Sequence, residues 1–174
     1  MDIFIEKIIT KDKSVKDTIL KILIVTIAII LCIVALFFPT LGSLELLKYV
    51  NFVLAILVVY VAYRLLGSLN VEYEYSVTSD YIDIAKIMSQ RRRKKVIRIE
   101  MGSIAIIAPI TYPEHMSINK KEMQRVIYAV GNMQNNDVYY IIAKVDGKLC
   151  LVYIEPDERI LEAFKTDVKS KFKE

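Results

Sequence analysis

The sequence predicts an α+β membrane protein in which a two-helix transmembrane hairpin precedes a domain of about seven antiparallel strands with a C-terminal capping helix. Three observations carry this prediction. The chain of 174 residues is 55% hydrophobic and 25% charged, and the two classes are segregated along it. Long apolar runs fill residues 19–66, apolar and polar residues alternate from Val71 onward, and an amphipathic stretch ends the chain. Such segregation is typical of a membrane anchor attached to a globular domain.

Residues 19–38 are predicted to form the first transmembrane helix. Residues 22–38 carry no charge, and a helix over 19–38 is about 30 Å long, the thickness of the hydrocarbon core of a bilayer. A cleaved signal peptide is disfavoured, because the apolar run is too long, no cleavage site follows it, and a second run comes next. A pair of core helices in a soluble protein is disfavoured, because both runs are apolar on all sides.

Residues 46–66 are predicted to form the second span, after a short external turn at 39–45. Lys48 and Arg64 can reach the two interfaces of the membrane, and Tyr49, Tyr60 and Tyr63 fit its aromatic belts.

Flanking charges predict the orientation of the hairpin. Lysines are frequent before the first span and basic residues follow the second, whereas Lys48 is the only basic residue near the connecting turn. The positive-inside rule therefore places both termini in the cytoplasm of the cell. Residues 1–18 form a cytoplasmic N-terminal segment in this interpretation. Its apolar residues fit a short helix lying at the membrane interface: Ile3, Phe4, Ile5, Ile8 and Ile9.

The region 71–174, after a linker at 67–70, is predicted to be a cytoplasmic β-rich domain. Alternation is clean in VEYEYSVT, where it places Glu72 and Glu74 on the solvent side of a strand. Asp146-Gly147 predicts a two-residue hairpin turn. The predicted strands are 71–78, 81–88, 96–101, 104–110, 125–130, 138–145 and 148–154. After Pro156, an apolar stripe predicts a helix that caps the sheets: Ile160, Leu161, Phe164 and Val168.

This order of strands and final helix, the Glu-Tyr-Glu-Tyr motif at 72–75 and the basic run Arg91–Lys95 resemble bacterial PH-like (pleckstrin-homology-like) domains behind a transmembrane hairpin. The resemblance covers essentially the whole chain. It implies a PH-like β-barrel or sandwich, and it implies a fold far more than a ligand, since such domains are not generally assigned phosphoinositide binding.

The five consecutive cations are the candidate binding site. Only residues 67–70 separate the second span from the first strand of the domain, a reach of about 14 Å. If the strands form a meander, the first strand runs away from the membrane and the second returns to it. The turn at 90–95 then lies close to the bilayer. Every second turn lies at this end, so the later loop with two lysines also lies close to the bilayer. We expect these residues to face the anionic headgroups of the inner leaflet: Arg91, Arg92, Arg93, Lys94, Lys95, Lys120 and Lys121.

Two other roles of the basic run remain open: a solvated turn kept cationic by topology, and binding of an acidic protein or of nucleic acid. Nucleic acid is disfavoured because the net charge is only +4 and because no aromatic residue flanks the cluster.

The sequence does not predict an enzyme. His115 is the only histidine and lies in a polar loop, and the phosphate-cradling, nucleophile and metal-binding motifs are missing. We expect no cofactor and no metal, and Cys32 and Cys150 read as small buried hydrophobic residues.

Two classes of function are compatible with these features. The protein is either a membrane-tethered binding or scaffold module, with an unknown protein partner or a second copy of itself, or a small accessory subunit that joins a larger membrane complex through its helices.

Overall fold

The computed structural model describes residues 4–12, 14–37, 46–120 and 122–173. The chain divides into two compact units. One unit contains Lys13–Asn70 and the other contains the segments on either side of it, up to Asp12 and from Val71 onward. Each unit is described by itself.

The first unit is a pair of helices, α1 (Val15–Phe37) and α2 (Leu46–Ser68). Both are long and apolar enough to cross a membrane, over Val15–Leu36 and Tyr49–Ser68. The predicted turn at 39–45 lies outside the described residues. Apolar side chains on most faces of both helices are exposed, as expected of helices that lipid surrounds.

Small residues line the contact between the two helices. On α1, Ala28, Cys32 and Ala35 are half-buried, and on α2 Ala55 and Ala62 are half-buried. The Cys32 thiol donates a hydrogen bond to the carbonyl of Ala55, with a sulfur–oxygen distance of 3.8 Å. Small side chains allow close backbone approach, which is how helices associate where the hydrophobic effect does not drive them together.

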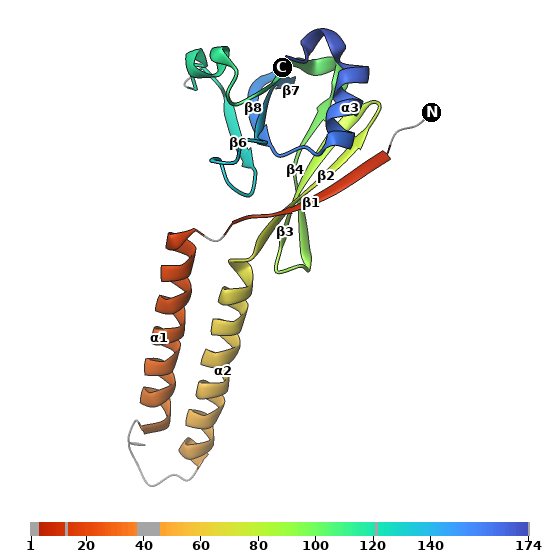
Figure 1. Cartoon of the computed structure of the whole chain (residues 1–174). Coiled ribbons are helices and arrows are strands. Elements are labelled where there is room, and N and C mark those ends of the chain that lie inside the picture. Colours follow the sequence, from red (N-terminus) through yellow and green to blue (C-terminus); the bar gives the residue numbers. More distant parts are fainter. Residues whose placement is uncertain (1–3, 13, 38–45, 121, 174) are drawn as a thin grey trace. The chain divides into compact units, whose positions relative to one another are not determined.

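The second unit contains two four-stranded sheets that do not close into a barrel (Figure 1). The first sheet has the order β1-β2-β3-β4 and the second β5-β7-β8-β6. The bounds are β1 Phe4–Thr10, β2 Val71–Thr78, β3 Tyr81–Met88, β4 Arg92–Glu100, β5 Ile104–Pro109, β6 Arg125–Ala129, β7 Tyr139–Val145 and β8 Lys148–Ile154. The described residues thus form eight strands where about seven were expected, and β6 pairs with β8 in parallel, not antiparallel.

Strand β1 corrects the expectation of an interfacial helix near the N-terminus. Residues 4–10 pair antiparallel with β2, from Phe4 opposite Thr78 to Thr10 opposite Glu72. Side chains of β1 alternate: Ile5 and Ile9 turn toward the core, whereas Phe4 and Ile8 are 66% and 58% exposed. A period of two places Ile8 and Ile9 on opposite faces, which a helix would not do.

The core lies between the two sheets and is closed by α3 (Glu158–Asp167), as the sequence predicted. Ile160, Ala163 and Phe164 of α3 are buried in it. The helix begins at Asp157, whose carboxylate accepts a hydrogen bond from the backbone N–H of Ile160 at 3.0 Å. Such a cap satisfies one of the free N–H groups of the first turn. Three short 3-10 helices complete the described part of the unit: Met101–Ser103, Pro113–Ser117 and Lys169–Lys171.

A buried tyrosine joins the two sheets. The Tyr75 hydroxyl of β2 donates to the carbonyl of Ala129 on β6 and accepts from the backbone N–H of Glu155, 3.2 Å away, just after β8. Burial raises the pKa of Tyr75 well above its usual value. On β1, Lys7 donates from Nζ to the carbonyl of Glu155 at 2.8 Å. The N-terminal strand is therefore held by the second sheet as well as by β2.

Candidate functional site

The candidate site is the hairpin of β3 and β4, called here the basic hairpin and comprising residues 86–95. Its turn is Ser89–Arg91, in which the Arg91 N–H bonds to the Met88 carbonyl at 3.2 Å. Strand β4 begins at Arg92, so four of the five consecutive cations belong to a strand and not to the predicted turn at 90–95. This difference matters because neighbouring residues of a strand point to opposite faces.

The turn adopts a backbone conformation that its residues do not favour. Ser89 and Gln90 have φ values of 55° and 54°, in the left-handed region that suits glycine and asparagine. Another tight hairpin turn, between β7 and β8, meets the same requirement at its second position with Gly147, at φ 77°.

We expect Gln90→Gly to raise the free energy of unfolding of the domain by about 1 kcal/mol, because it removes the Cβ clash of the left-handed conformation. Gln90→Ala keeps the Cβ atom and should bring no gain. Denaturant unfolding of the full-length protein in detergent micelles measures both variants, and equal midpoints for the two would contradict the prediction.

One face of the basic hairpin, its outer face, carries an ion pair between an exposed guanidinium and a buried carboxylate. Arg93 of β4 lies 2.5 Å from a carboxylate oxygen of Glu74 on β2. The Glu74 side chain is only 3% exposed, and its second carboxylate oxygen is buried without a hydrogen-bond partner in the described part of the chain. Glu74 therefore does not face solvent, contrary to the prediction from alternation. A buried carboxylate needs a compensating charge, and Arg93 supplies it.

The next cation on the outer face is paired as well. Lys95 lies 3.1 Å from a carboxylate oxygen of Asp83 on β3, and Arg98 binds both oxygens of the same carboxylate. The hydrogen bond from Arg98 holds the pKa of Asp83 below its usual value. The outer face thus places cations of β4 over carboxylates of β2 and β3.

The remaining cations of the run have different surroundings. Arg91, Arg92 and Lys94 are exposed, and none of them has an ion pair within the described residues. Lys94 lies directly opposite Lys86 in the ladder of β3 and β4, and Arg92 lies opposite Met88. Lys86 is not among the predicted site residues, although the alternation of Ile82, Ile84 and Lys86 along β3 places it on the core-side face.

The basic hairpin lies at the end of the first sheet from which the chain departs toward the helices. Met88, the last residue of β3, pairs with Val71, the first residue of β2. The ladder of β1 and β2 ends beside them, where the Lys11 N–H bonds to the Val71 carbonyl at 3.0 Å. Both connections to the helical unit therefore leave the domain at the same end as the turn of the basic hairpin.

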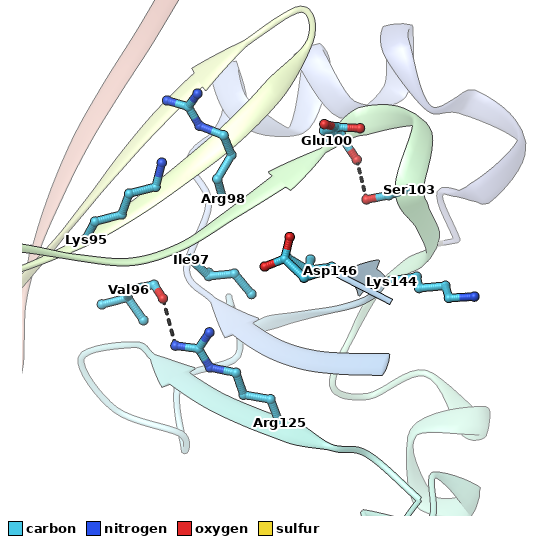
Figure 2. Close-up of a pocket in the computed structure, with 10 residues that line it drawn as sticks. Lys95, Val96, Ile97, Arg98, Glu100, Ser103, Arg125, Lys144 and Asp146 are labelled. Atoms are coloured by element: carbon cyan, nitrogen blue, oxygen red, sulfur yellow. Dashed lines mark hydrogen bonds between the residues drawn. The ribbon is translucent and has the colours of Figure 1, made fainter. Parts of the chain in front are cut away.

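A groove of about 560 Å³ opens along β4 (Figure 2). Ile84 pairs with Ile97 and Ala85 with Lys95, so Val96 is an extra residue in β4, a β-bulge. Arg125, at the start of β6, donates from Nη2 to the Val96 carbonyl at 2.8 Å. The groove is lined by Lys95–Arg98, Glu100, Ser103, Arg125 and Lys144–Asp146. Cations outnumber carboxylates among these residues, and β4 is an edge strand of its sheet.

Comparison with known families shows to which family the chain belongs. A family model described as bacterial PH-like domain (DUF6106) matches residues 1–174. The chain belongs to this family. The match confirms the resemblance seen in the sequence, including the PH-like fold of the β-rich part. No curated protein and no solved structure matches the chain significantly.

Lys120 of the later loop does not join the basic hairpin of this PH-like domain. Lys120 lies over the rings of Tyr128 and Tyr153, with Nζ 5.8 and 5.5 Å from the ring centroids. These tyrosines belong to β6 and β8, strands of the second sheet. Lys121 lies outside the described residues.

His115 of the PH-like domain is more constrained than a solvated loop histidine. Its Nε2 lies 3.1 Å from the Tyr153 hydroxyl, and its ring centroid is 5.1 Å from that of Tyr140. Partial burial and the nearby charge of Lys120 lower the pKa of His115. Through its contacts with these two tyrosines, His115 packs the 3-10 helix Pro113–Ser117 onto the second sheet.

Proposed function

We propose that this member of the PH-like family is an integral membrane protein that presents a binding or scaffold domain at the cytoplasmic face of the cell membrane. Both termini are cytoplasmic in this proposal, and the basic hairpin is oriented by anionic lipid. The two helices long and apolar enough to cross a membrane support the anchor. The pairing of β1 with β2 supports the placement of both termini, because strands on either side of the helical hairpin must lie on one side of the membrane to pair.

The single observation that carries the lipid proposal is the position of the basic hairpin within the domain. Its turn lies at the end of the sheet where Val71 begins, and only Leu69 and Asn70 separate Val71 from the end of α2. Two extended residues reach about 7 Å, so this end of the sheet is tied close to the end of a membrane span. Anionic headgroups attract cations at such a distance, which is within a Debye length.

The proposal is tested on the full-length protein in nanodiscs of neutral or anionic phospholipid. Hydrogen–deuterium exchange of the amides in residues 86–95 should be slower in anionic than in neutral nanodiscs, and high salt should abolish the difference. Exchange in β7 and β8 serves as the internal control, because the lipid should not change it. Equal exchange of the hairpin in both lipids would refute orientation by anionic lipid. A reporter fused after Glu174 that proved to be extracellular would refute the topology.

The scaffold part of the proposal rests on the groove beside β4. An edge strand offers unpaired N–H and C=O groups to an extended segment of a partner, and the groove adds charged side chains from β4, β6 and β7. The alternative is an accessory subunit that associates through α1 and α2. Arg125→Glu should remove a co-purifying partner held by the groove, whereas outward-facing substitutions in α1, such as Ile29→Ala with Ile33→Ala, should remove one held by the helices.

A further inference from the structure

The two faces of the basic hairpin differ in whether their cations are already neutralised. On the outer face, Arg93 and Lys95 are bound to Glu74 and Asp83. On the opposite face, which continues the core side of the sheet, Lys94 and Arg92 have no ion pair among the described residues. Five cations in sequence are therefore not five equivalent ligands for an anion.

The core-side face changes character as it approaches the turn. Tyr75 and Val77 of β2, like Ile82 and Ile84 of β3, are fully buried. The next two rows of the same face are Tyr73–Lys86–Lys94 and Val71–Met88–Arg92, and all their residues on β2 and β3 are half-buried. The core-side face of the sheet thus extends beyond the fully buried residues, and the part that extends toward the turn carries the cations Lys86, Lys94 and Arg92.

Lys86 and Lys94 form a pair that the fold alone does not explain. They lie directly opposite each other in the ladder of β3 and β4. Like charges at such positions destabilise a sheet, and the described residues include no carboxylate bound to either lysine. An anion placed between them from outside the chain would convert this repulsion into attraction.

Apolar side chains accompany these cations. Val71, Tyr73 and Met88 lie in the same two rows. The charge of Lys11, which follows β1, acts on the Tyr73 hydroxyl and opposes the rise in its pKa that burial causes. An apolar centre with a cationic rim matches the boundary between headgroups and acyl chains in an anionic bilayer.

We propose that this core-side end of the basic hairpin, formed by Lys86, Arg92 and Lys94 around Val71 and Met88, is the docking face for the phosphate groups of anionic phospholipid headgroups. Arg93 and Lys95 instead hold the sheet together through Glu74 and Asp83. The inference rests on the proposed function and assigns the binding of anionic lipid to the core-side face of the basic hairpin. It adds Lys86 to the site and keeps Arg92 and Lys94 of the five consecutive cations, while Arg93 and Lys95 belong to the outer face and Arg91 to the turn.

The experiment compares two variants of the full-length protein that lose the same charge from the same strand. Arg92→Gln with Lys94→Gln removes two cations from the docking face. Lys95→Gln with Arg98→Gln removes two cations from the outer face, where Asp83, at 23% exposure, is open enough to water to remain charged. A fluorophore at Gln90→Cys, with Cys32 and Cys150 replaced by alanine, reports the distance to the bilayer through quenching by spin-labelled headgroups. Thermal unfolding confirms that each variant is folded.

The unsubstituted protein should be quenched more strongly in anionic than in neutral nanodiscs. Loss of Arg92 and Lys94 should lower the ratio of docked to undocked domain about 30-fold, at about fivefold for each cation, and bring quenching to its level in neutral lipid. The Lys95 and Arg98 variant should stay within about twofold of the parent protein. An equal loss in both variants, or a loss only in the outer-face variant, would overturn the assignment to one face and leave the proposed function standing. Equal quenching of the parent protein in both lipids would overturn the proposed function itself.

Discussion

Replacing Ile5 and Ile9 together by serine is expected to lower the free energy of unfolding of the β-rich domain by about 4 kcal/mol, since deletion of a buried isoleucine side chain typically costs 2–5 kcal/mol. Ile9 is 9% exposed, and Ile5 packs against the same core. The measurement is the rate at which Cys150 reacts with a thiol reagent in the full-length protein in micelles. Cys150 is 2% exposed, so its reaction reports opening of the core.

A matched control exists in the same strand. Phe4→Ser with Ile8→Ser removes two apolar side chains from the exposed face of β1 and should change the stability by less than about 1 kcal/mol. If residues 4–10 instead formed an interfacial helix, Ile5, Ile8 and Ile9 would share a face. Equal effects of the two double substitutions would therefore contradict the strand.

Removing Arg93 is expected to have the second largest effect. Arg93→Met should destabilise the domain by about 3 kcal/mol, because it leaves the carboxylate of Glu74 buried without a compensating charge. Arg92→Met, on the same strand and without an ion pair among the described residues, should change the stability by less than about 0.5 kcal/mol. Denaturant unfolding in micelles measures both variants.

The double variant Glu74→Leu with Arg93→Met completes the cycle. It should recover most of the stability lost in Arg93→Met, because a buried ion pair can often be replaced by apolar side chains at little cost. A coupling energy near zero between the two positions would show that the effect of Glu74 on the free energy of unfolding does not depend on Arg93.

The sequence predicted the helices and most strands because each has a strong local signal. An uninterrupted apolar run predicts a span, and alternation from Val71 predicts a strand. Strand β1 had no such signal, since the apolar residues from Phe4 to Ile9 fit a period of 3.6 as well as a period of two. What decides between them is β2, which pairs with β1 but follows it only after both helices.

The chemistry of the basic hairpin was only partly predictable. Alternation along 71–78 showed that Glu74 shares a face with Glu72. It does not reveal whether side chains of neighbouring strands lie over Glu74 on that face. The cation that lies beside the buried Glu74 is Arg93, which reaches it across β3. The division of the cations between two faces required the register of β3 against β4, including the bulge at Val96. Neither the register nor the bulge can be read from one strand alone.

The first sheet combines a strand that precedes the two helices in the sequence with three strands that follow them, and this order has a consequence for biosynthesis. The ribosome completes β1 before either long helix, and β2 only after both. Until the second helix has emerged, Ile5 and Ile9 have no partner strand. We therefore expect the domain to mature only on chains whose helices have both been inserted, and chains arrested after one crossing to be recognised by proteolytic quality control through an incomplete sheet.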